Sequence, residues 1–172
     1  KIVPAKNELS LKNIQSNIDS IFNVIDIQMS LYNPESEIVK FNKSNDSLQI
    51  SKEFENVLLA SKYFNEITKG AFDISVGPLV KLWGFDNFSD NWVPPLDYQV
   101  EGVRKNTGNG YWSINNRSLS KSIEKLNIDV NAIAKGFGVD QIALFLLKSG
   151  FSNFLVEIGG EVYCHGFKNY NL

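Results

Sequence analysis

The segment Leu126–Gly138 constrains the fold more than any other stretch of this chain. Leu126, Ile128 and Val130 alternate with polar residues, which predicts a half-buried strand. Asn131 can accept hydrogen bonds from free backbone N–H groups, as the N-cap of the helix that follows. A strand would thus lead directly into a helix N-terminus, where unpaired N–H groups and the positive end of the helix dipole favour an anionic group.

The helix after Asn131 has an apolar stripe on one face, and Gly150 is predicted to end it. The residues that it should bury are Val139, Ile142, Ala143, Leu146 and Leu147.

Gly136 and Gly138 fall in the first turns of this helix, although each costs roughly 1 kcal/mol relative to alanine. Their presence indicates that something approaches the backbone closely. A ligand and a packed strand both explain this, and the sequence leaves both open.

Composition narrows the functional classes. The chain has 172 residues, enough to bury a core, and its formal net charge of −2 provides no basic field for a nucleic acid. Cys164 and His165 are single, which excludes an internal disulfide and a Cys- or His-rich metal cluster within this chain. No apolar run approaches the ~18–20 residues of a membrane span. The chain opens on Lys1 without Met, so the lack of a signal peptide says little about location.

An amphipathic helix is predicted over Leu9–Met29, with Ile14, Ile18, Ile21, Phe22 and Ile25 at helical spacing. It must stop by Asn33, because Pro34 disfavours the α conformation in the residue before it. Pro34 then suits the first turn of a short helix that carries Ile38, Val39 and Phe41, followed by a polar loop over 42–47.

A second long helix is predicted over Lys52–Lys69, after a short strand at Leu48–Ile50. Ser51 is its expected N-cap and Gly70 its end. Its predicted buried side consists of Phe54, Val57, Leu58, Ser61 and Phe64.

The second half alternates shorter elements. From Phe72 a strand is expected to lead into a short helix that ends at Gly84, followed by a polar loop over 85–95 that we expect to be mobile and beside a site. A weak helix follows over Pro94–Val103. Two hairpins are then predicted, one turning at 115–117 and one, between strands 154–158 and 161–165, at Gly159-Gly160.

Three stretches in order carry a family resemblance: Met29–Glu37 with Phe41-Asn42; Gly70–Asp73 through Val76–Leu79 and Leu82–Phe85; and Ile128-Asp129 through Ala134–Gly136 to Asp140, followed by Glu157–Glu161. In order and spacing, the chain from about Leu9 to Gly166 resembles the ApbE family, the FAD:protein FMN transferases (flavin transferases).

The resemblance implies an α+β, ApbE-like (T-fold-like) domain. It also implies Mg²⁺-dependent transfer of FMN from FAD to a Thr or Ser hydroxyl of an acceptor flavoprotein, with release of AMP. Such phosphoryl transfer depends on positioning and on neutralisation of developing charge by the metal. The resemblance further implies an exported, periplasmic or extracytoplasmic protein that is lipid-anchored to the cell membrane.

Carried over to this sequence, the flavin end of the family's site would consist of Tyr32, stacked on the flavin ring, with Met29 and Ser30 shaping that wall. Ala71, Phe72 and Asp73 would line the dinucleotide site.

At the other end of the site, Asp129 would hydrogen-bond FAD and Lys135 would lie near the phosphates. The backbone carbonyl of Ala132 would be a ligand of Mg²⁺, a role that any residue type can fill.

Each of these residues also has an ordinary structural interpretation. Tyr32 could be a half-buried aromatic, Asp73 and Asp129 caps or surface carboxylates, and Lys135 a solvated cation. Phe72 and Trp83 could be core residues, and Cys164 and His165 structural. The resemblance favours binding roles for Tyr32, Phe72, Asp73, Asp129 and Lys135 alone among these.

Family members continue well past Leu172, and their catalytic residues and side-chain metal ligands are expected in that part. We therefore expect 1–172 to be a single incomplete ApbE-like FAD-binding domain that is inactive alone. Two other functions stay open: an FAD pyrophosphatase that forms FMN and AMP, and a non-catalytic FAD-binding lipoprotein.

Overall fold

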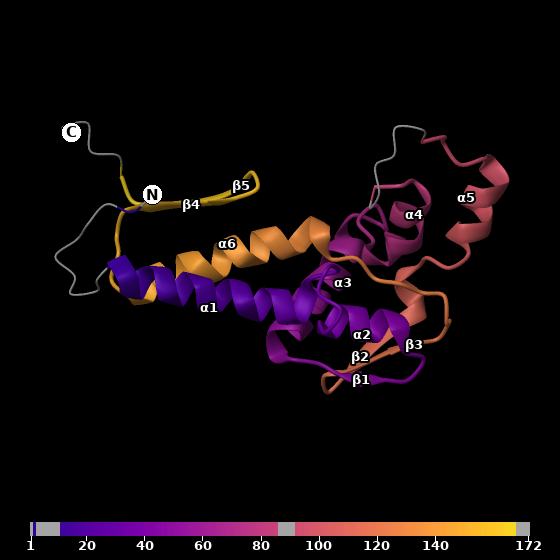
Figure 1. The fold of residues 1–172 in the computed structure, drawn as a ribbon, viewed down its shortest axis with the longest axis horizontal. Coiled ribbons are helices and arrows are strands. Elements are labelled where there is room, and N and C mark those ends of the chain that lie inside the picture. Colours follow the sequence, from indigo (N-terminus) through magenta and orange to yellow (C-terminus); the bar gives the residue numbers. More distant parts are fainter. Residues whose placement is uncertain (1, 3–10, 86–91, 168–172) are drawn as a thin grey trace. The chain divides into compact units, whose positions relative to one another are not determined.

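The computed structural model describes residues 2, 11–85 and 92–167 (Figure 1). Contacts within the chain divide it into two units: unit 1 holds Lys1–Asp26 and Ile133–Leu172, and unit 2 holds Ile27–Ala132. The division falls inside helix α1 (Leu11–Met29) and near the start of helix α6 (Asn131–Lys148). Helices and small sheets occur together, which confirms the predicted α+β class. The expectation of a single domain stays a prediction.

Unit 1 is built from α1, α6 and a hairpin of β4 (Phe154–Ile158) and β5 (Glu161–His165) (Figure 1). The strands pair antiparallel from Phe154 opposite His165 to Ile158 opposite Glu161, as predicted. The turn residues Gly159 and Gly160 have φ of +57° and +99°, a left-handed conformation that glycine adopts without strain.

The core of unit 1 lies between its helices and β4. Its buried members are Ile14, Val139, Ile142, Ala143, Leu146, Phe151, Phe154 and Val156. The predicted buried face of α6 is therefore confirmed, with Leu147 only partly buried. The prediction for Phe22 is wrong, because its side chain is 43% exposed and lies about 100° around α1 from the inward-facing Ile21.

Unit 2 contains a three-stranded antiparallel sheet, in the order β1 (Leu48–Gln49), β3 (Ser118–Lys121), β2 (Trp112–Asn115). The β2–β3 turn uses Asn116 and Arg117, both at positive φ, so the predicted hairpin is confirmed. The other elements are α2 (Glu37–Lys43), α3 (Lys52–Ile67), the short 3-10 helices η1 (Ile74–Val76) and η2 (Asn109–Tyr111), α4 (Gly77–Leu82) and α5 (Asp97–Arg104).

Helix α3 begins as predicted, since the Ser51 hydroxyl accepts the backbone N–H of Phe54 at 3.3 Å. Phe54, Val57, Leu58 and Ser61 are buried, but Phe64 is 41% exposed and faces the ring of Phe72 instead. The helix ends at Ile67, and the chain turns away at Gly70 with φ of +87°.

Three local predictions are wrong for a common reason: side chains compete for the backbone groups. Ser36, not Pro34, starts α2, because the Ser36 hydroxyl accepts the backbone N–H of Val39 at 3.2 Å. Residues 74–76 form η1 in place of a strand, because Asp73 Oδ1 accepts the backbone N–H of Ser75 at 2.8 Å.

The third concerns the segment Leu126–Val130, where Leu126, Ile128 and Val130 are fully buried, as the alternation indicates. The segment is nevertheless not a strand. Its backbone groups do not pair with a neighbouring strand. Instead, Ile128 bonds to the Asn42 side chain, and the Asp129 N–H donates to the Ile74 carbonyl at 2.7 Å. The alternation of apolar residues thus predicts correctly which side chains are buried, but it predicts a strand that does not form.

Predictions for the loop over 85–95 lie largely outside the described residues. After it, α5 begins at Asp97, later than the predicted Pro94. No helix among the described residues is long and apolar enough to cross a membrane.

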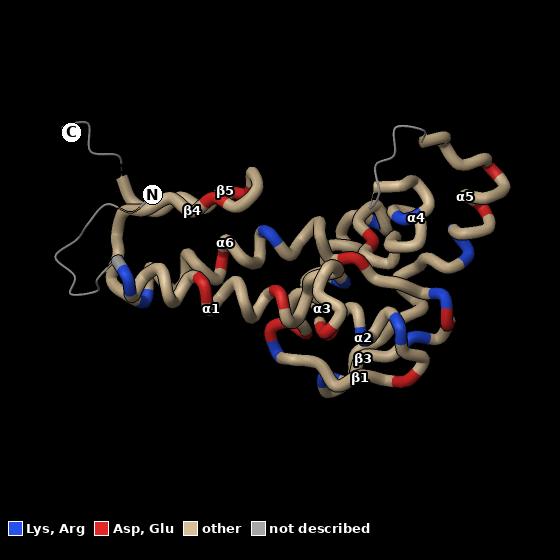
Figure 2. The backbone as a smooth tube through the Cα atoms, in the orientation of Figure 1, with Lys and Arg blue, Asp and Glu red and all other residues tan. Residues whose placement is uncertain are grey.

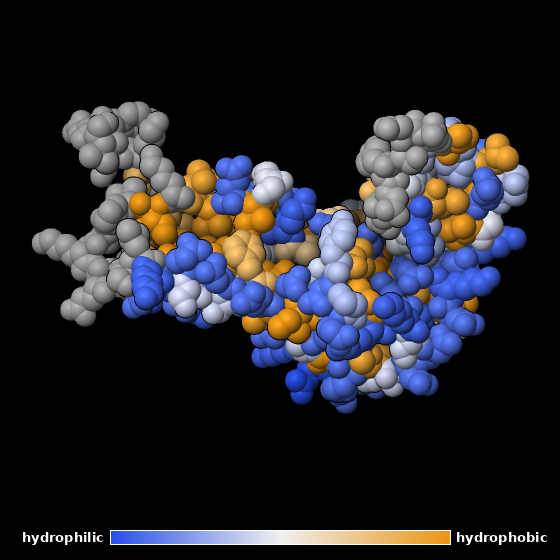
Figure 3. All heavy atoms as spheres, in the orientation of Figure 1, coloured by the Kyte–Doolittle hydropathy of each residue, from blue (hydrophilic) through white to orange (hydrophobic). Residues whose placement is uncertain are grey.

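The described surface carries no field of one sign, because Lys and Arg are interspersed with Asp and Glu in both units (Figure 2). Apolar side chains interrupt the hydrophilic surface at several places (Figure 3). Val93 and Leu96 in unit 2, and Leu144 and Val162 in unit 1, are among the exposed ones.

Candidate functional site

A cavity of about 500 Å³ lies within unit 2. This volume falls in the range of about 300–1,000 Å³ that is typical of small-molecule pockets. Three segments far apart in the sequence line it: Leu31, Tyr32, Val39, Asn42 and Lys43; Gly77, Pro78 and Lys81; and Asn127, Ile128 and Asp129. The lining thus combines an aromatic ring, two cations, amides and one carboxylate.

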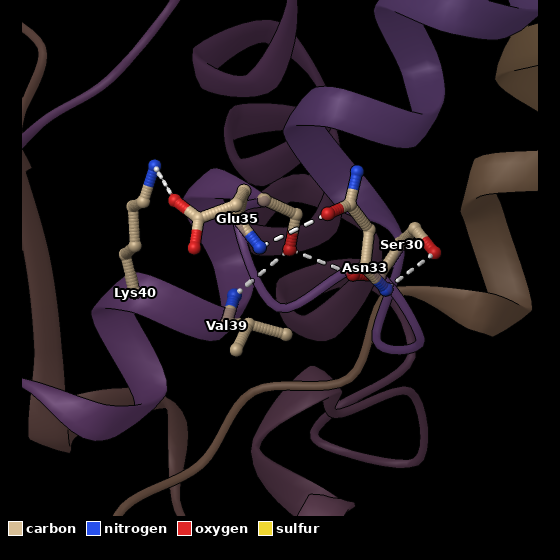
Figure 4. Close-up of polar contacts among 6 residues, drawn as sticks. Ser30, Asn33, Glu35, Val39 and Lys40 are labelled. Atoms are coloured by element: carbon tan, nitrogen blue, oxygen red, sulfur yellow. Dashed lines mark hydrogen bonds and ion pairs between the residues drawn. The ribbon is translucent and has the colours of Figure 1, made fainter.

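The first wall is formed by a tight turn between α1 and α2 (Figure 4). The hydroxyl of the fully buried Ser36 donates to the carbonyl of Ser30 at 2.7 Å and caps α2. The Ser36 N–H donates to the Asn33 carbonyl at 3.1 Å, and the Ser30 hydroxyl accepts the N–H of Asn33 at 3.3 Å. These bonds fix the backbone on both sides of Tyr32.

The same turn is closed on its outer side by charged and amide groups (Figure 4). Asn33 Oδ1 accepts the backbone N–H of Glu35 at 2.9 Å, and Glu35 forms an ion pair with Lys40 at 3.3 Å. Both charged side chains are largely exposed, so this ion pair contributes little to stability.

Tyr32 is 83% exposed although its backbone is held by this turn. An exposed aromatic ring on a fixed backbone, at the edge of a cavity, is well placed to stack on a planar ligand ring. The structure therefore does not support the half-buried interpretation of Tyr32. Met29 is only 2% exposed and Ser30 uses its hydroxyl within the turn, so both could shape this wall only from behind.

Asp129 lines a second wall of the cavity, formed by residues 127–129, and is 9% exposed. Its Oδ1 atom accepts the backbone N–H of Asn131 at 2.8 Å. The prediction that Asn131 is the N-cap is therefore wrong: Asn131 is the first residue of α6, and the carboxylate two residues earlier accepts its N–H. Asp129 thus has a capping role and a place in the cavity at the same time.

Asn42 connects these two walls. Its side-chain oxygen accepts the N–H of Ile128 at 2.9 Å, and its side-chain nitrogen donates to the carbonyl of the same residue at 2.9 Å. Lys121 Nζ donates to the carbonyls of Asn42 at 3.0 Å and Leu126 at 3.2 Å. Burial disfavours the charged amine and lowers the pKa of Lys121, while Glu124 raises it by a smaller amount.

Ala71, Phe72 and Asp73 are not part of the cavity lining. Asp73 caps η1, and the ring of Phe72 contacts that of Phe64 with centroids 5.9 Å apart. Their contacts fit the structural interpretations, and their predicted roles toward FAD stay predictions. The segment that follows Asp73 runs through η1 to Gly77 and Pro78, and these two residues do line the cavity.

The last two predicted residues lie on the first turns of α6. Ala132 is exposed and belongs to unit 2, whereas Lys135 belongs to unit 1. Lys135 Nζ lies 3.9 Å from the Glu161 carboxylate, with both side chains 40% or more exposed, so the pair is weak. The proximity of Lys135 to phosphates stays a prediction.

Within the described ranges, no three or more His, Cys, Asp and Glu side chains are placed to share a metal ion. A Mg²⁺ site usually includes one or two carboxylates. The described residues show no such cluster, and both the need for Mg²⁺ and the Ala132 carbonyl as its ligand stay predictions.

Sequence reasoning did not select Asn42, Lys43, Lys81 or Asn127 as site residues. The signal for the two lysines is helical spacing: Lys43 follows Val39 by one turn on α2, and Lys81 follows Pro78 by one turn on α4. That spacing becomes informative only once Val39 and Pro78 are known to face the same cavity.

Fold and site together define an α+β protein with a cavity of small-molecule size. The profile of the ApbE family matches residues 2–171, so the chain belongs to the ApbE family. This confirms the resemblance found in the sequence.

Curated relatives carry the name FAD:protein FMN transferase. The protein of Vibrio cholerae is 38% identical over 157 residues, which cover 90% of this chain and 47% of the relative. That of Haemophilus influenzae is 35% identical over 156 residues, covering 87% and 45%. The chain therefore spans about half the length of the curated relatives it matches.

Solved structures of flavin transferases have folds similar to that of this chain. The flavin transferase ApbE from Vibrio cholerae has a TM-score of 0.91 at 36% identity, covering 97% of this chain and 55% of that one. The flavinyl transferase ApbE of Pseudomonas stutzeri, in its apo form, has a TM-score of 0.89 at 28% identity, covering 98% and 56%.

Proposed function

We propose that the protein carrying this chain is a Mg²⁺-dependent FAD:protein FMN transferase. In the reaction, a Thr or Ser hydroxyl oxygen of an acceptor flavoprotein attacks the phosphorus of the FMN half of FAD. The bond from that phosphorus to the bridging oxygen breaks, AMP leaves, and the hydroxyl proton is lost. The observation that carries the proposal is the cavity that both Tyr32, with its exposed ring, and Asp129 line, in a chain of the ApbE family.

The chemistry of the lining fits FAD. A tyrosine ring offers a stacking surface for the flavin, and the ammonium groups of Lys43 and Lys81 favour an anionic group such as a phosphate. Asp129 supplies acceptor oxygens for polar groups of the dinucleotide. Met29 and Ser30 are proposed to support the Tyr32 wall from behind, and Ala71, Phe72, Asp73 and Lys135 are proposed to contact FAD.

Mg²⁺, when bound, would neutralise charge that develops on the phosphoryl oxygens. The Ala132 carbonyl is proposed as one ligand. The catalytic residues and the side-chain metal ligands of the family are assigned to no residue of this chain, so we propose that residues 1–172 alone are inactive.

The transfer reaction is tested with the full-length protein, FAD, Mg²⁺ and a candidate acceptor. Mass spectrometry should detect FMN attached to the acceptor, together with free AMP. Free FMN and AMP without a modified acceptor would identify an FAD pyrophosphatase instead. FAD that binds without turnover under any metal would identify a non-catalytic carrier.

Flavin stacking on Tyr32 is tested by flavin fluorescence, because an electron-rich ring quenches the emission on contact. Quenching should disappear in Tyr32→Ala with the melting temperature unchanged, since the side chain is 83% exposed. Tyr98→Ala is the matched control, because Tyr98 is also exposed, at 71%, and does not line the cavity. Equal quenching in both variants would contradict the placement of the flavin.

The location is proposed from the family alone: an exported protein, anchored by lipid at the cell membrane, that acts on an extracytoplasmic flavoprotein. Cell fractionation of the source organism, with antibody detection in the periplasmic and membrane fractions, tests it. Recovery from the cytoplasm alone would contradict it.

A further inference from the structure

Asn42 makes a two-point contact with the backbone of Ile128, a residue 86 positions away. Its amide oxygen accepts the Ile128 N–H and its amide nitrogen donates to the Ile128 carbonyl, both at 2.9 Å. Residues 126–130 are in no strand, so the amide provides what a neighbouring strand otherwise provides.

Further hydrogen bonds hold the residues on both sides of this contact in place. Lys121 Nζ bonds to the carbonyls of Asn42 and Leu126, which joins the end of α2 to the residue that begins the buried segment. On the other side, the N–H of Asp129 donates to the carbonyl of Ile74 at 2.7 Å. Asp129 therefore follows directly after a residue, Ile128, whose backbone N–H and carbonyl are both fixed by Asn42.

We infer that Asn42 is a positioning residue, which sets where the Asp129 carboxylate stands in the cavity. The inference rests on the proposed function, because it takes FAD as the ligand that Asp129 contacts. It adds Asn42 to the residues that influence FAD binding, although Asn42 would act by positioning Asp129.

A two-point contact has a consequence that ordinary packing lacks. Removing the amide leaves the N–H and the carbonyl of Ile128 without these partners, and the segment then satisfies them by moving. Because Asp129 is the next residue, its carboxylate moves with that segment. A small displacement of a binding group is enough to weaken a ligand contact.

The decisive experiment is a double-mutant cycle on FAD affinity in the full-length protein. Asn42→Ala should weaken FAD binding about tenfold, as loss of one or two hydrogen bonds predicts. Asp129→Asn removes the charge but keeps an oxygen for the Asn131 N–H. In the Asp129→Asn background, Asn42→Ala should have little further effect. Asn45→Ala, an exposed asparagine outside the cavity lining, should leave the affinity unchanged in both backgrounds.

A second variant covers the case in which Asn42→Ala does not fold. Asn42→Asp has the same shape and keeps the acceptor, but its carboxylate opposes the Ile128 carbonyl. Once protonated, the carboxylic acid again offers one acceptor and one donor. The loss of FAD affinity relative to wild type should therefore shrink as the pH falls from 8 to 5. The charged groups around this position are Lys121, which contacts the Asn42 backbone, and Lys43, Lys81 and Asp129, which line the cavity; all four are common to both proteins.

The outcomes separate the two proposals. A wild-type protein that binds no FAD overturns the proposed function and, with it, the role given to Asp129. A wild-type protein that binds FAD, with Asn42→Ala equally damaging in both backgrounds, overturns the inference alone. A pH-independent loss in Asn42→Asp also overturns it, whereas a non-additive cycle with pH-dependent recovery supports it.

Discussion

At the scale of the residue, Ser36 has a larger structural role than its size suggests. Its fully buried hydroxyl caps α2 and also donates to the Ser30 carbonyl, so one oxygen holds the turn that carries Tyr32. The serine therefore contributes to the site without belonging to the cavity lining.

Ser36→Ala should lower the free energy of unfolding by about 1–2 kcal/mol, since the helix loses its cap and the turn loses its link. Urea denaturation measures this. Ser47→Ala, an exposed serine in the following loop, should change it by less than about 0.5 kcal/mol. Similar losses in the two variants would show that the hydroxyl of Ser36 has no special role.

Lys121 predicts a pH dependence of stability. Burial lowers its pKa in the folded state below the ordinary value of 10.5, so the unfolded chain holds the proton to a higher pH. Stability should therefore rise with pH between the lowered pKa and 10.5, as the folded protein sheds the buried charge. Lys121→Arg stays charged throughout, so wild type should gain stability relative to this variant over that range. A difference in the free energy of unfolding between the two proteins that stays the same at every pH from 7 to 10.5 would contradict this.

At the scale of the element, predictions succeed where a short sequence determines the geometry. The Gly159-Gly160 turn and the Ser51 cap were identified because their chemistry is local. The strand prediction for residues 126–130 is wrong because alternation reports burial, while the partner of the Ile128 N–H is the distant Asn42. The strand prediction for residues 72–76 is wrong because Asp73 accepts the nearby N–H of Ser75. Tyr32 and Asp129 could be placed from motifs, but Lys43 and Lys81 could not, because the cavity joins segments that are distant in sequence.

The two glycines of α6 differ in their surroundings. A Cβ atom at Gly138 would lie 3.2 Å from Ile25 Cδ1 and 3.4 Å from Ile158 Cδ1, so close packing explains this glycine. A Cβ atom at Gly136 would have nothing within 4 Å, so the ligand alternative stays open there.

Gly136→Ala should therefore raise the free energy of unfolding by about 0.5–1 kcal/mol, the usual gain of alanine over glycine in a helix. Gly138→Ala should raise the free energy of unfolding by less, because the side chains of Ile25 and Ile158 must shift to make room. Thermal denaturation of both variants measures the difference. FAD affinity of Gly136→Ala then tests for a ligand: weaker binding in a more stable protein would indicate that FAD approaches the helix backbone, and a lower stability than wild type would contradict the expectation.

At the scale of the whole molecule, every residue that lines the cavity belongs to unit 2, whereas Lys135 belongs to unit 1. The proposed FAD site therefore depends first on the folding of residues 27–132. Core substitutions in that unit should weaken FAD binding through stability, without any contact with the ligand.

FAD should raise the melting temperature of the full-length protein. At a concentration about 100 times the dissociation constant, binding to the folded state adds about 2.7 kcal/mol. That would be roughly 5–10 °C for 150–250 residues, and the shift is smaller for a longer protein. Differential scanning calorimetry measures the shift, and it should be much smaller in Asp129→Asn. A shift of equal size in that variant would remove Asp129 from the FAD contact.

The bond between Asn42 and Ile128 also has a consequence for biosynthesis. The two residues are 86 positions apart, so a ribosome that adds about 5–20 residues per second needs roughly 4–17 s to make the second after the first. During that interval α2 can form, but the wall that contains Asp129 does not yet exist. The nascent chain therefore cannot form this cavity, or hold FAD in it, until the third lining segment, residues 127–129, has left the exit tunnel.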